Sequence, residues 1–209
     1  MSLTLYTNPM SRGRIARWMC EEIRAGAGID YETVILDYDG AMKADDYLAV
    51  NPMGKVPAID HDGRIVTEAA AICAYLADAV PKANLAPAPD DRADYYRWLF
   101  FAAGPLEQAV VNRALGVTQD ADQSRTVGYG TYERTVDVLD GWLGRHDYVC
   151  GGRFTAADVY VGAAVGWGLA FKTLPERPAF RAYDARLSDR PAFREAVRID
   201  DALLAEAGG

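Results

Sequence analysis

Cysteine is scarce in this 209-residue chain, which has three of them and no C-x-x-C pair. Cys20 and Cys73 lie in stretches with helical spacing, where a thiol usually acts as a small buried hydrophobic group. Cys150 makes the number odd. Histidine is scarcer still, and His61 and His146 stand apart with no second ligand at a spacing that holds a metal ion. We therefore expect a reduced, cytoplasmic protein without a metal site.

Positive charge is also in deficit, with 22 Lys and Arg against 30 Asp and Glu and a net charge of −8. An acidic surface repels phosphate backbones, so we expect no nucleic-acid partner. The opening MSLTLYTNPM has no basic segment followed by an apolar one, and we expect no secretory signal. The charge-free apolar run at residues 159–171 is too short to span a bilayer, and we expect no membrane contact.

The first part of the chain contains alternating strand and helix patterns. Strand, helix, strand, helix, hairpin and helix patterns succeed one another at residues 3–7, 12–25, 31–38, 41–50, 56–67 and from 68 onward. The hairpin is indicated by HDG, with glycine at the turn between two strand segments. The last helix is alanine-rich. This order predicts a small α/β domain over residues 1–80.

The stretch PKANLAPAPDD follows this domain, and its prolines mark a linker at residues 81–90. Beyond the linker we find no convincing strand pattern. Helical patterns follow instead at residues 90–115, 123–145 and from 154 onward. The first should bend near Gly104-Pro105. The last begins with Thr155 and Asp158 at the spacing of a capping box. We therefore predict an all-helical domain over residues 91–209.

The order of elements in the first domain is that of a thioredoxin-like unit, whose active site lies where the first strand leads into the first helix. LYTNPMS resembles the corresponding stretch of glutaredoxins, in which a nucleophilic cysteine follows the strand. Here Ser11 occupies that position, and Arg14 stands where a second thiol would be. The chain therefore lacks a redox dithiol of its own. Ser11 could instead donate a hydrogen bond to a thiol that a ligand brings.

Several motifs together make the resemblance specific. A serine after the first strand, NPMGKVPAI, TEAAAICAYL, a proline-rich linker, FTAAD and RPAFREAV occur in this order through essentially the whole chain. The ordered set resembles a soluble glutathione S-transferase of bacterial, serine-dependent type. The resemblance implies a thioredoxin-like domain that binds glutathione and an all-helical domain that contributes the electrophile site. It also implies a cytoplasmic homodimer with a role in detoxification.

The resemblance accounts for a proline among strand-forming residues, where it has no N–H to give a sheet. In the family this proline is cis, and the residue before it shows its N–H and C=O to the cysteinyl unit of glutathione, a form of β-augmentation. Val56 and Pro57 match these two positions. The alternative is a merely buried turn proline.

Other glutathione contacts carry over by position. Glu68 opens the alanine-rich helix, where unpaired N–H groups favour a ligand carboxylate, and its own carboxylate could hold the ligand's amino group. Lys43 and Lys55 resemble positions that meet the glycyl carboxylate or nearby backbone, with solvated surface charges as the alternative. Ala69 departs from the family pattern, which usually has serine or aspartate there. The missing hydroxyl contact is worth roughly 1.5–3 kcal/mol, so glutathione binds weakly or a different thiol is preferred.

Ser11 is the candidate catalytic residue. A free thiol has a pKa of about 8.5, and a hydroxyl donor together with a helix N-terminus favours the thiolate. The alternative for Ser11 is an ordinary helix N-cap, which serine also favours. Tyr6 and Asn8 are the runners-up for the catalytic role.

The resemblance implies glutathione as co-substrate and attack of its thiol on small hydrophobic electrophiles. Aromatic residues of the helical domain are candidates for the electrophile site, with core packing as the alternative: Trp98, Phe101, Trp167 and Phe171. Glutathione-dependent reduction, peroxidase activity or isomerisation is the alternative among enzymes. A non-catalytic ligand-binding homologue, favoured by Ala69, is the alternative outside them.

Overall fold

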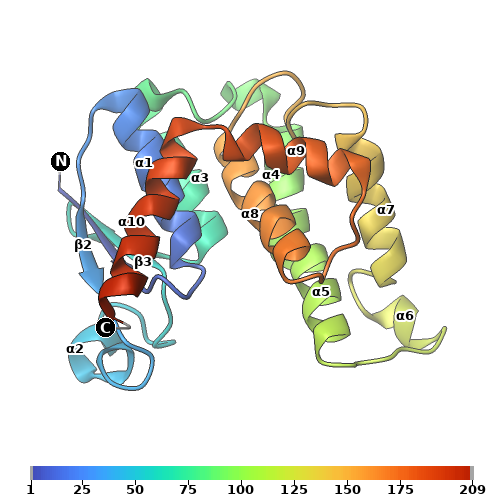
Figure 1. The fold of residues 1–209 in the computed structure, drawn as a ribbon, viewed down its shortest axis with the longest axis horizontal. Helices are drawn as coiled ribbons and strands as arrows, with labels where there is room; N and C mark the ends of the chain where they lie inside the picture. The colour runs from blue at the N-terminus through green and yellow to red at the C-terminus, as the bar shows by residue number, and fades with distance from the viewer. Residues whose placement is uncertain (1, 208–209) are drawn as a thin grey trace. The chain divides into compact units, whose positions relative to one another are not determined.

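The computed structural model describes residues 2–207, and the chain divides into two compact units. The first unit runs from the N-terminal segment to Ala86 and also includes the segment from Asp189 onward, whereas the second spans Pro87–Ser188. We predicted the C-terminal segment as part of the helical domain. The structure corrects this prediction, because helix α10 (Pro191–Ala207) packs against the first helix of the chain (Figure 1).

A four-stranded sheet with the order β2-β1-β3-β4 forms the centre of the first unit. Its strands are β1 (Leu3–Thr7), β2 (Glu32–Ile35), β3 (Ala58–His61) and β4 (Arg64–Thr67). β1 pairs in parallel with β2 and antiparallel with β3, and β3 pairs antiparallel with β4. The predicted hairpin is confirmed. Asp62 and Gly63 form its turn with φ of 51° and 79°, the left-handed pair that a two-residue type I′ turn requires.

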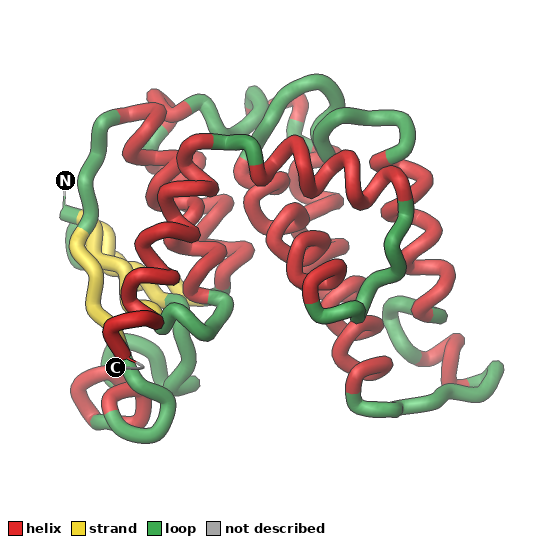
Figure 2. The backbone as a smooth tube through the Cα atoms, in the orientation of Figure 1, coloured by secondary structure: helices red, strands yellow, loops and turns green. Residues whose placement is uncertain are grey.

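The two faces of β1 are covered by different parts of the chain. Leu3, Leu5 and Thr7 are buried on one face, the face of α1 (Gly13–Ala27), and α3 (Ala69–Ala79) also packs on the sheet (Figure 2). Tyr6 points to the opposite face. There it packs with Tyr47 of the short helix α2 (Asp45–Leu48) in a cluster that also contains Leu36, Met42 and Ala58. A single helical turn at Ala41–Lys43 precedes α2.

Helix α10 is held on α1 by aromatic and ionic contacts. The rings of Trp18 and Phe193 meet edge to face with their centroids 4.9 Å apart. Arg190 donates two hydrogen bonds to the carboxylate of Glu22, at 2.6 and 2.7 Å. These partners lie at opposite ends of the chain, and this is why the helical pattern of residues 191–207 did not reveal which unit the helix joins.

The second unit is all-helical. Its helices are α4 (Ala93–Phe101), α5 (Glu107–Ala114), α6 (Gln123–Thr126), α7 (Tyr132–Leu143), α8 (Ala156–Ala170) and α9 (Pro178–Ser188). A wider helical turn at Ala102–Leu106, which contains Pro105, joins α4 to α5 at the predicted bend. The helix predicted over 123–145 is instead two helices. Gly130, with φ of 69°, breaks it, and Thr131 starts α7 by accepting the N–H of Arg134 at 3.2 Å.

The predicted capping box at the start of α8 is confirmed. The carboxylate of Asp158 accepts the backbone N–H of Thr155 at 2.8 Å and its hydroxyl at 3.1 Å. The same carboxylate accepts the N–H of Val149 and the hydroxyl of Tyr183, each at 2.8 Å. Asp158 and Thr155 are both fully buried, so this polar cluster lies in the core of the second unit.

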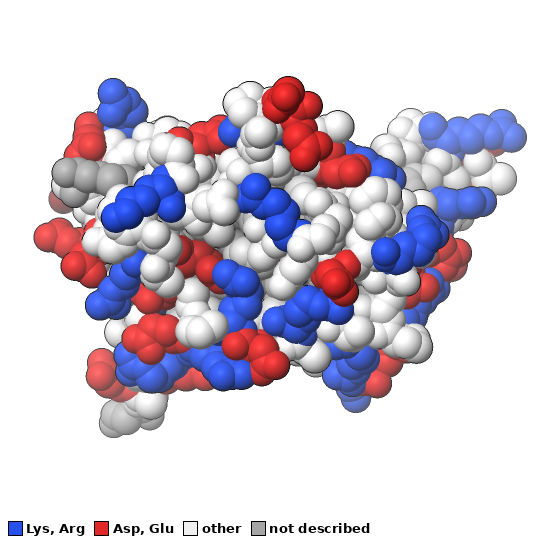
Figure 3. All heavy atoms as spheres, turned by 90° about the horizontal axis from the view of Figure 1, so that it is seen from above, with Lys and Arg blue, Asp and Glu red and all other residues white. Residues whose placement is uncertain are grey.

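Acidic and basic side chains alternate on the face shown in Figure 3, and neither sign covers a large continuous area there. Within residues 2–207, no helix combines the length and the apolar character that crossing a membrane requires.

Candidate active site

Three segments of the first unit meet at one end of the sheet because of its register. β1 ends at Thr7, and the residue before it, Tyr6, pairs with Ala58 at the start of β3. Ala58 pairs in turn with Thr67 at the end of β4. The chain leaving β1, the chain entering β3 and the chain leaving β4 therefore lie together at one end of the strands. We call this end of the sheet the site edge. These segments carry the predicted site residues Ser11, Val56, Pro57, Glu68 and Ala69.

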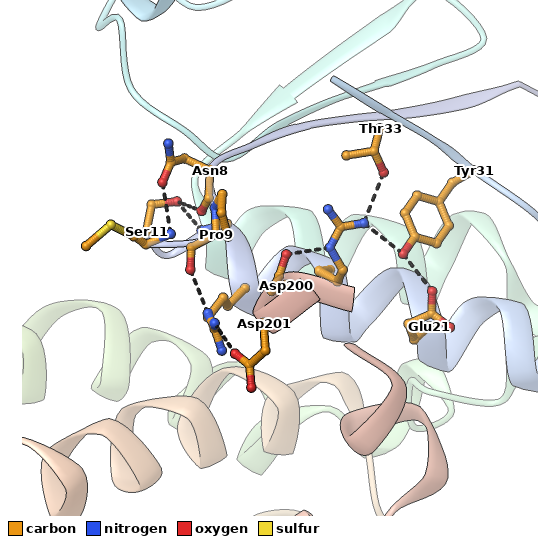
Figure 4. A network of polar contacts seen from close by, with 12 residues as sticks. Asn8, Pro9, Ser11, Glu21, Tyr31, Thr33, Asp200 and Asp201 are labelled. Carbon is orange, nitrogen blue, oxygen red and sulfur yellow. Dashed lines mark hydrogen bonds and ion pairs between the residues drawn. The ribbon is translucent and has the colours of Figure 1, made fainter. Parts of the chain in front are cut away.

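Hydrogen bonds hold Ser11 in a tight loop before α1 (Figure 4). Its hydroxyl donates to the carbonyl oxygen of Asn8 at 2.7 Å and accepts the N–H of Gly13 at 2.9 Å. The backbone N–H of Ser11 also donates to the Asn8 carbonyl, at 3.0 Å. The half-buried side chain thus accepts an N–H at the start of the helix, as a capping residue does. Its single O–H donor is used in the hydrogen bond to a backbone carbonyl.

Gly13 lets the start of α1 approach β1 closely. A Cβ atom at this position would lie 1.9 Å from the Thr7 hydroxyl oxygen and 2.9 Å from that of Ser11. Thr7 is fully buried, and among the described residues its hydroxyl has no hydrogen-bond partner. Because position 13 has no side chain, α1 can begin close to β1, and Ser11 is held at this close approach. The spacing of apolar residues in the sequence did not indicate this role of Gly13.

The two runners-up for the catalytic role lie differently. Tyr6 packs on the other face of the sheet, where its ring centroid is 5.7 Å from that of Tyr47. Thr7, and not Tyr6, is the β1 residue that faces the start of α1. Asn8 lies in the Ser11 loop, but its amide donates to the carbonyl of Leu36 at 2.8 Å and accepts the N–H of Met10 at 2.9 Å. Its side chain thus ties the loop to the segment after β2.

The peptide bond between Val56 and Pro57 is cis, as the resemblance implied. Val56 is half-buried and precedes β3. Among residues 2–207, neither its N–H nor its C=O forms a hydrogen bond. The backbone ahead of the cis proline is therefore free to pair with a ligand at the sheet edge.

Two side chains that we did not single out from the sequence hold the loop before Val56. The Tyr47 hydroxyl and the Asn51 amide both donate to the carbonyl oxygen of Lys55, each at 2.7 Å. Burial raises the pKa of Tyr47 to about 12, so its hydroxyl remains a donor at neutral pH. The Asn-Pro pair at the start of NPMGKVPAI is a turn signal that could have identified Asn51, but our reading of the sequence did not use it.

Glu68 connects β4 to α3 in an unusual backbone conformation. Its φ is 68° and its ψ is 117°, a region that non-glycine residues seldom occupy and that is often found at functional sites. The exposed side chain does not cap α3, and the first turn of that helix has no acidic residue. Ala69, the first residue of α3, is buried.

Comparison with protein families agrees with this geometry. A family model described as the N-terminal domain of glutathione S-transferase matches residues 1–78, and one described as the C-terminal domain matches residues 120–191. The chain belongs to the glutathione S-transferase family. As a member it is an enzyme, a glutathione transferase with glutathione as co-substrate.

Individual relatives cover most of this transferase. Glutathione S-transferase GstA of Escherichia coli O157:H7 is 33% identical over 78% of this chain and 79% of its own. Glutathione S-transferase 3 of Zea mays is 31% identical over 93% of each chain. The solved structure of a sphingomonad glutathione S-transferase complexed with glutathione is 29% identical, with a TM-score of 0.76 over 95% of this chain and 98% of that one.

The ammonium groups of the two candidate lysines of the transferase differ in their hydrogen bonds. Nζ of Lys43 donates to the carbonyl oxygen of Gly54 at 2.6 Å, which ties the segment before α2 to the loop before Val56. The side chain of Lys55 is exposed, and it has no hydrogen bond or ion pair within residues 2–207. Lys55 therefore has the freer ammonium group.

The candidate aromatic residues of the transferase's second unit differ in exposure. Trp98 is fully buried and packs against Trp142, with ring centroids 5.3 Å apart, which favours its interpretation as a core residue. Phe101 and Trp167 are half-buried, and Phe171 is 74% exposed. The last three offer aromatic surface to a ligand, whereas Trp98 does not.

The cysteines of the transferase are free thiols, with Cys20 and Cys73 buried and Cys150 half-buried. Burial raises the pKa of Cys20 to about 12 and that of Cys150 to about 11, so both are protonated at neutral pH. Within residues 2–207, no group of three or more His, Cys, Asp or Glu side chains is arranged to hold a metal ion.

Proposed function

We propose that Ser11 of this transferase activates the thiol of glutathione for attack on small hydrophobic electrophiles. The observation that carries the proposal is the sheet register, which sets the Ser11 loop, the Val56 backbone and Glu68 at one edge. A short thiol-containing peptide bound across this edge would meet a hydroxyl donor, an unpaired backbone segment and a carboxylate.

The Ser11 hydroxyl can change acceptors without leaving a buried group unpaired. In the free protein the hydroxyl donates to the carbonyl oxygen of Asn8, which also accepts the N–H of Ser11. When the O–H turns toward a ligand sulfur, the Asn8 carbonyl keeps that N–H, and the Ser11 oxygen still accepts from Gly13. A hydrogen bond to a charged group contributes about 1.5–3 kcal/mol. One pKa unit corresponds to about 1.4 kcal/mol, so this bond can lower the thiol pKa by one to two units.

The remaining parts of glutathione fit the other groups of the edge. The free N–H and C=O of Val56 would pair with the cysteinyl unit as an added strand does. The Glu68 carboxylate would hold the ligand's amino group, and the unpaired N–H groups at the start of α3 would hold its γ-glutamyl carboxylate. Lys55, with its free ammonium group, suits the glycyl carboxylate better than Lys43, which Gly54 already engages.

We infer that the second unit contributes the contacts to the electrophile through Phe101, Trp167 and Phe171. Apolar and aromatic surface of this kind favours small hydrophobic compounds. A role in cytoplasmic detoxification fits this substrate class. Ser11 and Arg14 stand where a dithiol site would have its two thiols, so a reduction at this edge would have to use the thiol of glutathione itself.

We also infer that the transferase is a homodimer. Tyr96 and Phe100 lie one turn apart on α4 and are 42% and 72% exposed, and a partner that covers neighbouring apolar side chains removes them from water. Light scattering at micromolar concentration should give the mass of two chains, and the mass of one chain would refute the inference.

Binding and turnover can be separated experimentally. Calorimetric titration of the full chain should show binding of glutathione and of S-methylglutathione, which has no free thiol. Only glutathione should yield products when chlorodinitrobenzene, an epoxide and an organic hydroperoxide are supplied in turn. Binding without turnover on any of them would support the non-catalytic alternative that Ala69 favours. Turnover of the hydroperoxide alone would assign a peroxidase.

A further inference from the structure

Arg14 joins the loop that carries Ser11 to the C-terminal helix. Its Nε donates to the carbonyl oxygen of Pro9 at 2.6 Å, and its terminal nitrogen donates to the carboxylate of Asp201 at 2.5 Å (Figure 4). Pro9 follows Asn8, whose carbonyl accepts the Ser11 hydroxyl. One guanidinium group therefore connects the Ser11 loop to α10.

A buried ion pair fixes α10 one residue before Asp201. Nε of Arg17 lies 2.8 Å from the carboxylate of Asp200, and the two side chains are only 2% and 1% exposed. Arg17 also donates to hydroxyl groups on and next to β2, at 3.0 and 3.1 Å. Since breaking a buried pair leaves an uncompensated charge, α10 cannot slide along α1 at low cost. Asp201 is therefore held beside Arg14.

We propose that Asp201 is a positioning residue for the Ser11 hydroxyl and acts through Arg14 and the carbonyl group of Pro9. The proposal rests on the role of Ser11 in thiol activation. A guanidinium group presents its donors in a rigid planar fork, so a carboxylate on one edge orients the N–H on another. With Asp201 in place, the Nε–H of Arg14 donates to the carbonyl oxygen of Pro9 and restrains the loop. The position of this loop sets the direction of the Ser11 O–H, which must point at the sulfur of the bound thiol. A small misplacement of a group that acts on the reacting atoms reduces turnover strongly.

A purely electrostatic role of Asp201 makes the opposite prediction for the thiol. Removing a negative charge near the site would leave the Arg14 cation uncompensated, and a nearby cation favours a thiolate. Loss of positioning would weaken the hydrogen bond from Ser11 and disfavour the thiolate. The titration of bound glutathione therefore distinguishes the two roles.

The first test compares Asp201→Asn, Asp201→Glu and the control Glu195→Gln with the full wild-type chain. Glu195 lies on the same helix and pairs with Arg198 at 2.7 Å, so the control also removes an exposed ion pair. We expect Asp201→Asn to lower kcat with chlorodinitrobenzene about three- to tenfold, below the roughly hundredfold loss of a misplacement by 1 Å. The KM for glutathione should change little, and the thiol pKa, followed by thiolate absorbance, should rise. Asp201→Glu should recover part of kcat, and Glu195→Gln should match wild type.

A double-mutant cycle with Ser11→Ala shows whether Asp201 acts through Ser11. In the Ser11→Ala background, Asp201→Asn should cause no further loss of kcat, because the group that it positions is gone. An undiminished loss in that background, a lowered thiol pKa, or a kcat equal to that of the Glu195→Gln control would each overturn the proposal. If Ser11→Ala itself leaves kcat and the thiol titration unchanged, the proposed function fails first and the role of Asp201 fails with it.

A further variant keeps the test informative should Asp201→Asn fold poorly. Arg14→Lys retains a positive charge but loses the planar fork that reaches Pro9 and Asp201 together. It should reproduce the loss of kcat with an unchanged thermal midpoint. Wild-type kcat in Arg14→Lys would contradict the proposal.

Discussion

The hydroxyl of Ser11 donates to the carbonyl oxygen of Asn8, three residues earlier, at a distance of 2.7 Å. The proton that would stabilise a bound thiolate is thus held by a neutral backbone acceptor in the free protein. A hydrogen bond to an ionised acceptor is roughly twice as strong as one between neutral groups, so a thiolate can replace the carbonyl as the acceptor of the Ser11 hydroxyl. The proposed activation of the thiol by Ser11 therefore requires an exchange of acceptors and no large movement of the chain.

Replacing Ser11 by alanine should raise the pKa of the bound thiol by about one unit, equivalent to about 1.4 kcal/mol. Turnover near neutral pH should fall about tenfold or more and recover partly as the pH is raised, because hydroxide then supplies the missing thiolate. Glutathione affinity should persist, since Val56 and Glu68 are unchanged. Thiolate absorbance of the bound ligand measures the pKa directly.

The capping role of Ser11 predicts a different result for the same variant. Loss of the contact to the Gly13 N–H alone would lower the free energy of unfolding by about 0.5–2 kcal/mol and leave the thiol titration unchanged. Identical titration curves for wild type and variant would thus remove Ser11 from the chemistry. Asn8, which shares the loop, would be the next candidate.

Gly13→Ala should destabilise the first unit and impair glutathione turnover. The new Cβ would lie 1.9 Å from the Thr7 hydroxyl oxygen, so α1 and β1 would have to move apart where Ser11 is held. Overpacking of this kind costs about 1–3 kcal/mol, which denaturant unfolding can measure. Gly104→Ala is the matched control, because its Cβ would meet nothing within 4 Å. Equal stability of both variants would show that the close approach at Thr7 is relaxed in solution.

Thr155→Ala should lower stability without affecting the chemistry. The variant loses the cap of the buried helix α8 and leaves one hydrogen bond to Asp158 unmade. The expected loss is about 0.5–2 kcal/mol in the free energy of unfolding. Thr131→Ala removes the cap of α7 at an exposed position and should cost less. A larger effect at Thr131 would contradict the importance of burial here.

Asp158 should make the stability of the transferase depend on pH. Burial raises its pKa to about 6 in the folded protein, above the value of about 3.9 expected in the unfolded chain. Because the folded state holds this proton more tightly, the carboxyl's contribution to stability is fully present below about pH 4 and is lost as the pH rises through about 6.

Asp158→Asn provides the comparison, because an amide does not titrate. The variant should be less stable at every pH, but its deficit relative to wild type should shrink between about pH 4 and pH 7. Denaturant midpoints of both proteins across this range measure the deficit. A deficit that grows with pH would show that the hydrogen bonds to the carboxylate outweigh its burial and hold its pKa below the ordinary value.

Local signals in the sequence predicted the features that depend on neighbouring residues. The Asp62-Gly63 turn and the Thr155–Asp158 capping box follow from backbone preferences and from side-chain reach over a few positions. The order of motifs led to the family, and with it to the cis bond before Pro57. Where glycines fell inside a helical pattern, as at Gly130, periodicity alone predicted one helix where two exist.

The sequence by itself determined the succession of strands and helices, the turns and caps, and the family to which the chain belongs. Only the tertiary structure decided that Tyr6 faces away from α1, that Gly13 makes room for Thr7, and that α10 joins the first unit. Arg17 and Asp200 are 183 positions apart. The pattern of an amphipathic helix shows which of its faces is buried, but it does not show which apolar surface of the protein that face packs against. The partner is chosen by packing and by charges that meet only after the chain has folded.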